Sequence, residues 1–444
     1  MIASDPPPLT FIDRILRRAV PVEPGEAGVM LRSFGIFFCV LCGYYVLRPV
    51  REEIGTSIGQ EGLQWLFLAV FGAMLALVPA FGWIVQTLAR RHVLPAIYGF
   101  FIVNLLIFWA VFSASPERPG VLAGSLFFVW ASVYNLFIVS LFWSLTSELY
   151  SNAQAKRLYG FIAAGGSTGA LVGPLLARTL ASQIQPNDLL LIAAGFLGLA
   201  LFAALDLRRA FRALPADFDR QEDAPAGSNG IFAGAQRVFT SRYLFLIALY
   251  VLIANLIGTY FYLEQIRIVG LEIPERIARV EFFASRDLLV SFISVLLQLF
   301  VTARLMQWLG LGVALAALPL TAAIGLTALS LAPTLYVVAA VMVAERAIWF
   351  ALSNPALKVL YTVVTPDEKY KAQNFVDTVV YRGGDAASGW VFNTGAKALG
   401  LAGGTLALLT MPIVALWLAV AYGLGRRHAG KAAEQIALLK SPAV

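Results

Sequence analysis

The chain contains twelve long apolar stretches, and this pattern restricts the folds open to it more than any other feature. About 20 apolar residues are enough to cross the hydrocarbon core of a bilayer as a helix. Hydrophobic residues make up 59% of the chain and charged residues 13%, whereas soluble domains have about 45–50% and about 25%. The sequence therefore predicts an all-α polytopic membrane protein, placed in the inner (plasma) membrane. The twelve expected transmembrane helices cover residues 30–50, 63–88, 93–112, 121–147, 158–183, 189–205, 242–265, 283–303, 311–330, 335–361, 374–396 and 402–424.

Charged residues are unevenly shared among these spans. Five spans contain no Asp, Glu, Lys or Arg between their ends: 63–88, 93–112, 189–205, 311–330 and 402–424. The other spans contain or adjoin charged residues. A charge at bilayer depth costs at least about 2.5–3.5 kcal/mol, so it normally faces a bundle interior or a water-filled cavity. The pattern indicates that some helices line a polar cavity and the rest are scaffold, as is typical of a transporter.

One long polar segment, residues 206–241, separates the spans into two sets of six. It predicts a cytoplasmic linker between an N-terminal tail and bundle (1–205) and a C-terminal bundle and tail (242–444). The halves also show a weak repeat, because Gly43 through Gly55 aligns without gaps on Gly258 through Gly270. A parallel repeat of six helices resembles the two-bundle plan of the major facilitator superfamily, in which four helices of each half face a central cavity.

Topology accounts for much of the formal charge of +7. With both termini in the cytoplasm, most of the 33 Lys and Arg fall in cytoplasmic tails, loops and helix ends, as the positive-inside rule requires. These charges are spread over many short loops, which argues against nucleic acid as a partner. Cys39 and Cys42 lie within a span and are expected to pack as small hydrophobic residues. The sequence shows neither a nucleophile–base pair nor a metal-ligand set, so we expect no enzyme activity, catalytic residue, metal or cofactor.

The first expected helix carries the most suggestive charged residues. Arg48 and Arg51 are three residues apart and share one helix face, and Glu52 is one turn beyond Arg48 and can pair with it. Pro49 predicts a break or kink between them. Two guanidinium groups on one face suit a phosphate or carboxylate, and Tyr45 could stack on a base or ring. The alternative is an interfacial anchor with arginines reaching water.

The seventh, eighth and tenth expected helices also carry charge. Glu264 is expected near the end of the seventh helix, as a gate between the halves or a proton site. Arg286 and Asp287 are expected to open the eighth helix, and Arg346 follows Glu345 midway along the tenth. Adjacent helical residues point about 100° apart, so one of that last pair could face the cavity. The alternative for Glu264 is an interfacial carboxylate, and the alternative for the pairs in the eighth and tenth helices is structural pairing between helices.

The tenth and eleventh expected helices combine charges with helix-breaking residues. Asn354 and Pro355 are expected to interrupt the tenth helix and free backbone carbonyls, with Lys358 one turn further on. In the eleventh helix Arg382 precedes Asp385 by three residues, and Gly383 and Gly384 between them predict a hinge. The substrate-binding candidates are thus Arg48, Arg51, Tyr45, Arg286, Arg346, Lys358 and Arg382. The gating or coupling candidates are Glu52, Glu148, Glu264, Asp377 and Asp385.

Small residues in the fifth helix have a different role. Gly165, Gly169 and Gly173 stand four residues apart. The spacing lacks the Lys-Ser/Thr and the strand of a phosphate loop, so it predicts close packing against another helix.

Several segments resemble the bacterial and plastid ATP/ADP translocases, a nucleotide transporter family related to the major facilitator fold. Leu47-Arg48-Pro49-Val50-Arg51-Glu52 is similar to the "LRDTKD" of that family's first helix. Phe142-Trp143 and Gln154-Ala155-Lys156-Arg157-Leu158-Tyr159-Gly160 resemble "FW…QAKRFYPLFG". The stretch that contains Lys358, Tyr361, 367–372 and 375–377 is similar to the family's tenth-to-eleventh helix region.

The resemblance implies exchange of ATP for ADP plus phosphate, with cavity cations binding the substrate. Arg51 falls where the family has its first-helix Lys, Arg48 matches its Arg, and Glu52 its Asp. Lys358 matches the tenth-helix Lys, and Glu264 falls near an acidic position. Pro49 and Val50 replace an Asp and a Thr, and the segment after Lys358 is shorter than in the family.

The sequence therefore predicts a monomeric secondary transporter that moves a small anionic or phosphorylated solute, such as ATP, ADP and phosphate, across the lipid bilayer by alternating access, as an antiporter. Two alternatives remain. One is a proton-coupled carrier of another organic solute, with Glu264 or Asp377 as the proton site. The other is a major-facilitator-like protein that handles lipid, which a lateral apolar opening would favour.

Overall fold

The computed structural model describes residues 22–23, 26–87, 90–114, 120–212, 233–365, 368, 372–373, 375–395, 398, 400 and 403–440. Within these residues the chain is helical and contains no strand. They divide into two compact units. Unit 1 lies within Met1–Glu52, Trp83–Gly227 and Val280–Leu288, and unit 2 within Glu53–Gly82, Ser228–Arg279 and Leu289–Val444. Each unit therefore includes a segment from the other half of the sequence.

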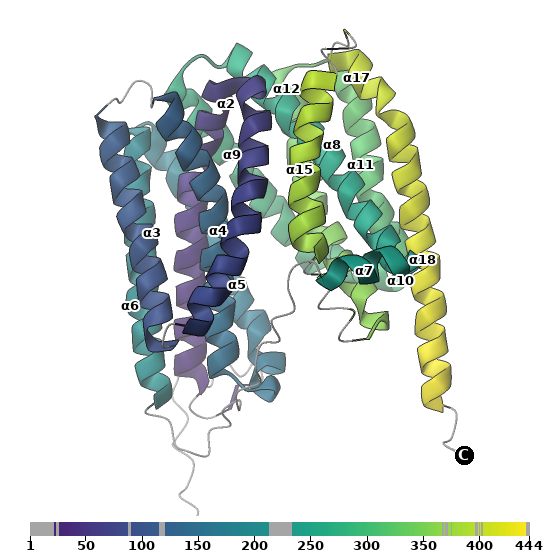
Figure 1. The fold of residues 1–444 in the computed structure, drawn as a ribbon, viewed down its shortest axis with the longest axis horizontal. Coiled ribbons are helices and arrows are strands. Elements are labelled where there is room, and N and C mark those ends of the chain that lie inside the picture. The colour runs from purple at the N-terminus through teal and green to yellow at the C-terminus, as the bar shows by residue number, and fades with distance from the viewer. Residues whose placement is uncertain are drawn as a thin grey trace, which may run out of the picture. The chain divides into compact units, whose positions relative to one another are not determined.

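Unit 1 contains the first and the third to sixth expected spans, the last residues of the second, and residues 280–288 at the start of the eighth (Figure 1). Its elements are both ends of α2 (Glu26–Thr87), α3 (Arg90–Ser113), α4 (Val121–Leu149), α5 (Asn152–Ala181), η1 (Pro186–Asp188) and α6 (Leu189–Arg212). Helix α3 lies beside α4 and α6. Helix α4 supplies much of the core, since Phe127, Phe128 and Tyr134 are fully buried.

The glycine spacing of α5 brings it against the start of α2, as predicted. A Cβ atom placed on Gly169 would meet the carbonyl oxygen of Phe38 at 2.4 Å, and one on Gly165 would meet that of Phe34 at the same distance. A Cβ on Gly173 would meet the carbonyl of Cys42 at 2.7 Å. Only glycine permits this backbone approach. Cys42 is buried in the same contact, and both cysteines are free thiols.

Unit 2 contains the helices of the second half. They are α7 (Ala233–Thr240), α8 (Arg242–Glu272), the ends of α9 (Arg276–Leu297), α10 (Ala303–Trp308), α11 (Leu311–Leu331), α12 (Leu335–Ile348), α13 (Asn354–Leu360), α15 (Tyr381–Trp390), α17 (Gly403–Leu409) and α18 (Met411–Lys440). Helix α8 packs against α12, α15 and α18, and α11 packs against α12 and α18.

The centre of α2 also belongs to unit 2. Gln64 accepts hydrogen bonds from the side chains of Asn393 and Thr394, each at 3.0 Å. The rings of Trp65 and Trp390 meet edge to face, 4.8 Å apart. These contacts attach the second expected span to the eleventh.

In the described part of the second half, four π-helical turns interrupt the helices, at Gln298–Thr302, Trp349–Ser353, Val376–Val380 and Val391–Gly395. The second turn directly precedes Asn354-Pro355, where the sequence predicts freed carbonyls. The hydroxyl of Thr302 donates to the Ala351 carbonyl at 2.7 Å, and Gln298 donates to the Phe350 carbonyl at 3.1 Å. Proline has no N–H to donate, and the π-helical turn changes the backbone hydrogen-bond pattern. The side chains of Thr302 and Gln298 supply donors to carbonyls at this place.

The twelve expected spans agree with the described helices once two details are considered. Ten helices are long and apolar enough to cross a membrane among the described residues, the first being Glu26–Leu77. That helix contains two expected spans, because Gly59 has φ of 79° and breaks it. The eleventh span, within residues 376–395, carries Asp377, Arg382 and Asp385 and is not among the ten.

Several predicted boundaries were wrong. Helix α6 continues to Arg212 and α7 forms within the expected linker, while residues 213–232 lie outside the described chain. Helix α8 continues to Glu272 and α9 begins at Arg276. The break predicted at Pro49 is not present. Within α2 only Gly59 has non-helical backbone dihedrals, so the backbone is helical through Pro49. The predicted bounds are those of the apolar stretches, which mark the membrane core. A helix can continue beyond the apolar stretch as long as its backbone hydrogen bonds continue.

Candidate functional site

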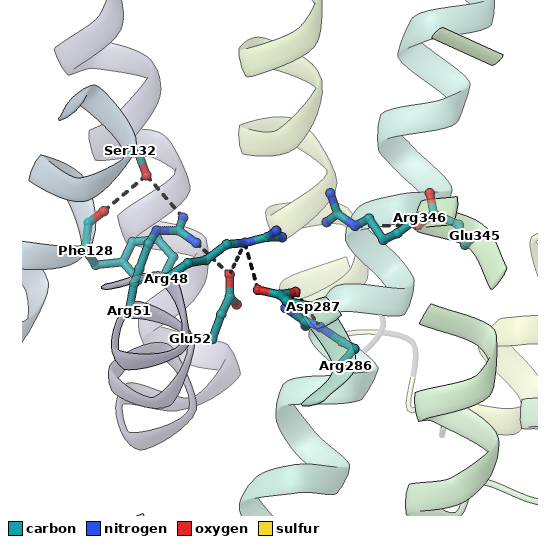
Figure 2. A network of polar contacts seen from close by, with 9 residues as sticks. All are labelled: Arg48, Arg51, Glu52, Phe128, Ser132, Arg286, Asp287, Glu345 and Arg346. Atoms are coloured by element: carbon teal, nitrogen blue, oxygen red, sulfur yellow. Dashed lines mark hydrogen bonds and ion pairs between the residues drawn. The ribbon is translucent and has the colours of Figure 1, made fainter. Parts of the chain in front are cut away.

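Five charged side chains in unit 1 form a continuous line of alternating sign (Figure 2). We call this line the ion ladder; in order, it consists of Arg51, Glu52, Arg48, Asp287 and Arg286. The successive N–O distances are 3.0, 3.8, 3.5 and 2.8 Å. Residues 280–288 of α9 are thus held against α2 by Asp287, which the sequence could not indicate.

The helical geometry of α2 explains half of the ion ladder. Glu52 lies one turn beyond Arg48, so the two side chains share a face, as predicted. The unbroken helix at Pro49 preserves this register. Arg286 and Asp287 lie in the third turn of α9 rather than at its start, because α9 begins seven residues earlier than expected. Their side chains are 3% and 1% exposed.

Arg51 has an aromatic as well as an ionic environment. Its guanidinium carbon lies 3.8 Å from the centroid of the Phe128 ring. One terminal nitrogen donates to the Ser132 hydroxyl at 3.1 Å, and that hydroxyl donates to the Phe128 carbonyl at 3.1 Å. Arg48 lies over the Tyr45 ring, 5.6 Å from its centroid. Both guanidinium groups thus lie over an aromatic ring, and that of Arg51 also donates to a hydroxyl group.

The second-half candidates form separate pairs in unit 2. Nε of Arg346 lies 3.6 Å from Glu345, shown in Figure 2. Nη1 of Arg382 lies 3.5 Å from Asp385, whose other oxygen lies 3.5 Å from the hydroxyl of Thr259. The adjacent glycine Gly384 has a packing role, because a Cβ there would meet Asn255 at 3.3 Å.

Lys358 and Asp377 are in contact at 2.8 Å and are about half exposed. They line a small cavity of about 30 Å³ together with Trp349, Asn354 and Tyr361. The hydroxyl of Tyr361 is buried there without a hydrogen-bond partner. The sequence-predicted cation of the tenth helix therefore has a carboxylate partner from the eleventh.

Two further predicted gating residues have arginine partners. Glu264 pairs with Arg267, one turn along α8. It lies inside the helix rather than at its end, because α8 continues to Glu272. Glu148 lies at the end of α4 and contacts Arg208 of α6 at 3.2 Å.

Sequence reasoning missed a second buried cluster, in unit 2. Glu53, with a side chain 1% exposed, contacts Arg276 at 3.1 Å and Arg279 at 3.2 Å. It also accepts a hydrogen bond from Ser57 at 2.8 Å. The signal in the sequence is the acidic pair Glu52-Glu53 at the end of an apolar span, but the partners are more than 220 residues away.

The segment that begins with Gln154 has a structural role. Ser151 caps α5, with Gln154 completing a capping box. Arg157 donates to both oxygens of the buried Glu26 at 2.9 and 3.0 Å, and Gln154 donates to Glu26 at 3.1 Å. These residues connect the starts of α2 and α5.

The model of the Major Facilitator Superfamily matches residues 33–389, most of the chain. The protein belongs to the major facilitator superfamily. It is therefore a multi-pass membrane transporter. No curated protein matches the chain.

Solved structures share the fold at low sequence identity. The nucleoside transporter NupG has a TM-score of 0.60 and 13% identity, over 91% of this chain and 99% of that one. A bacterial homologue of the lysosomal transporter Spinster has a TM-score of 0.56 and 15% identity, over 92% and 99%. A POT family transporter, solved with a thioalcohol-conjugated peptide, has a TM-score of 0.61 and 13% identity, over 90% and 96%.

Proposed function

We propose that the protein is a secondary transporter of an organic anion that carries a phosphate group, working by alternating access as an antiporter. The observation that carries this proposal is the placement of Arg48 and Arg51 in unit 1. Their side chains are only 11% and 15% exposed, and their guanidinium groups lie over the rings of Tyr45 and Phe128. Preoriented guanidinium groups bind phosphate in a bidentate manner.

Nucleotides are the phosphorylated anions that the sequence favours. The resemblance of residues 47–52 and of the Lys358 region to the ATP/ADP translocases supports this assignment. The aromatic ring of Tyr45 beside Arg48 would supply a stacking surface for a base. We assign Arg286, Arg346, Lys358 and Arg382 to further substrate contacts during transport.

The acidic partners would act in gating. An anion that binds Lys358 competes with Asp377, and one that binds Arg382 competes with Asp385. Glu52 would respond to an anion on Arg48 in the same way. Release and re-formation of these pairs would couple substrate binding to conformational change. We place both termini in the cytoplasm and take the transporter to be a monomer.

A proton-coupled carrier is the second candidate. It is favoured by the carboxylate that accompanies each candidate cation described above. A carboxylate that loses its cation to the substrate is stabilised by taking up a proton, because an unpaired buried charge is costly. Transport would then follow the pH gradient.

Counterflow in proteoliposomes tests the proposal. Vesicles loaded with unlabelled phosphorylated anion should accumulate the labelled anion, and Arg48→Ala should abolish accumulation. Vesicles without internal anion should accumulate little. Uptake that needs no internal anion and follows an imposed pH gradient would instead identify the proton-coupled carrier. If no phosphorylated anion is accumulated under either condition, the proposal is wrong.

A further inference from the structure

A cavity of about 520 Å³ lies in unit 2, between the part of α2 that follows Gly59 and the π-helical turn Val391–Gly395. The side chains that line it are mostly polar or aromatic and include Glu61, Gln64, Trp65, Asn393 and Thr394. The proposed function uses none of them. Small-molecule sites are typically concavities of about 300–1,000 Å³ with a few well-placed polar groups, so the cavity has the size and lining of a binding site.

Two amide side chains in the cavity have a defined orientation. Nδ2 of Asn393 donates to the backbone carbonyl of Gln60 at 3.4 Å and to Oε1 of Gln64 at 3.0 Å. A carbonyl oxygen can only accept, so these contacts assign the oxygen and the nitrogen of both amides. Oε1 of Gln64 also accepts from the Thr394 hydroxyl at 3.0 Å.

The other atom of each amide makes no hydrogen bond among the described residues. These atoms are a donor, Nε2 of Gln64, and an acceptor, Oδ1 of Asn393. The two residues are only 8% and 5% exposed, yet neither of these atoms is sealed from solvent. A ligand that pairs with both atoms would be favoured, and a hydroxyl group can accept from one and donate to the other.

An exposed aromatic ring lies beside the two amides. Trp65 lines the cavity and is 58% exposed. The Trp390 ring meets it edge to face at 4.8 Å, which supports its position. The face of an aromatic ring is electron-rich and attracts weakly positive C–H groups. A sugar ring presents C–H groups on its faces and hydroxyl groups around its rim, and the carboxylate of Glu61 is a further acceptor for hydroxyls.

We propose that this cavity binds a sugar ring, which stacks on Trp65 while its hydroxyl groups pair with Gln64 and Asn393. The site is additional to the anion site at Arg48 and Arg51, and it does not depend on the proposed function. Two sources share the required chemistry, namely a free sugar in water and the headgroup of a glycolipid. The experiment has one arm for each source.

Binding is measured on the full-length protein in phosphatidylcholine nanodiscs, because sugar-based detergents would compete for the site. In the first arm, methyl β-glucoside, methyl β-galactoside and methyl β-riboside are titrated, and saturation-transfer NMR gives the dissociation constant. In the second arm, galactosyl or glucosyl diacylglycerol replaces part of the phosphatidylcholine, and the melting temperature is measured. The wild type should bind a free glycoside saturably or show a higher melting temperature with the glycolipid. Response to the glycolipid alone assigns the source to a headgroup.

Trp65→Ala should weaken binding of the free glycoside at least about fivefold, because the stacking surface is lost. It should also remove the rise in melting temperature that the glycolipid causes. Trp308→Ala is the matched control, because Trp308 is 77% exposed and lies on α10. The control should behave as the wild type in both arms.

Gln64→Glu tests the hydrogen bonds separately. The variant keeps an oxygen for Asn393 and Thr394 but replaces the Nε2 donor by a second carboxylate oxygen. It should weaken glycoside binding about fivefold, as expected for one lost hydrogen bond. Gln236→Glu is the control, because it adds the same charge at an exposed position of α7 and should leave binding unchanged.

Two results would overturn the inference. One is a wild type that responds to no free glycoside and to no glycolipid. The other is equal binding by the wild type, Trp65→Ala and Gln64→Glu, in which case Trp65 is an ordinary aromatic residue of the membrane interface. If Trp65→Ala shows no cooperative melting, Gln64→Glu decides. Either result leaves the proposed function standing, because counterflow of the phosphorylated anion tests that function independently.

Discussion

Nε of Arg276 lies 3.1 Å from Oε2 of Glu53, a carboxylate that is almost fully buried. The contact joins the end of the first expected span to the start of α9, across more than 220 residues of sequence. Arg279 and Ser57 complete the cluster. Nearby, the side chain of Gln60 donates to the Leu263 carbonyl at 2.8 Å. Residues 53–60 of the first half are thereby fixed to residues of the second half within unit 2.

Glu53→Gln should destabilise the protein. The neutral amide would leave two guanidinium groups without their carboxylate, and breaking a buried ion pair costs about 3–5 kcal/mol. The loss is measured as a lower free energy of unfolding or melting temperature in detergent. Glu272→Gln is the control, because Glu272 is exposed and accepts a hydrogen bond from the backbone amide of Leu335. Equal stability of the two variants would show that the Glu53 cluster contributes nothing.

Arg51→Ala should reduce binding of a phosphorylated anion at least about tenfold, because a hydrogen bond to a charged group contributes about 1.5–3 kcal/mol. Arg51→Lys should bind with intermediate affinity. Lysine keeps the positive charge but has no planar guanidinium to lie over Phe128. It also lacks the terminal nitrogen that donates to the Ser132 hydroxyl. Titration calorimetry on the purified variants measures both effects. Wild-type affinity in Arg51→Ala would place the substrate elsewhere.

Gly169→Ala should lower the free energy of unfolding by about 1–3 kcal/mol, the usual cost of overpacking. The added methyl group would meet the Phe38 carbonyl at 2.4 Å, so α5 and α2 would have to separate. Gly198→Ala in α6 is the matched control, because nothing lies within 4 Å of its added Cβ. The control should equal or exceed wild-type stability, since alanine favours helix over glycine. Thermal unfolding of both variants decides between them.

The Lys358–Asp377 pair should contribute little to stability, although we assign it to transport. Both side chains are about half exposed, and exposed ion pairs contribute about 0.2–1 kcal/mol. A double-mutant cycle with Lys358→Ala and Asp377→Ala measures this coupling from unfolding. Transport should fall strongly in Lys358→Ala while its melting temperature changes little. A large coupling energy, or unaltered transport, would indicate a purely structural pair.

Local sequence patterns determined most of the helices of this protein. Apolar stretches gave the spans because backbone groups in lipid must hydrogen-bond within a helix. The four-residue spacing of Gly165, Gly169 and Gly173 predicted close packing, and the one-turn spacing of Arg48 and Glu52 predicted their pair. Both predictions concern residues close in sequence, where helix geometry fixes distance.

Contacts between distant residues could not be obtained in this way. Asp287 completes the ion ladder, and Arg276 and Arg279 clamp Glu53, yet nothing in the sequence near these residues specifies their partners. The same is true of Asp377, a predicted gating residue whose contact with Lys358 the sequence did not indicate. The sequence by itself determined a helical membrane protein with charged residues on particular faces. The tertiary structure decided which charges meet, because pairing across the bundle depends on how the helices pack and on where π-helical turns and Gly59 redirect them.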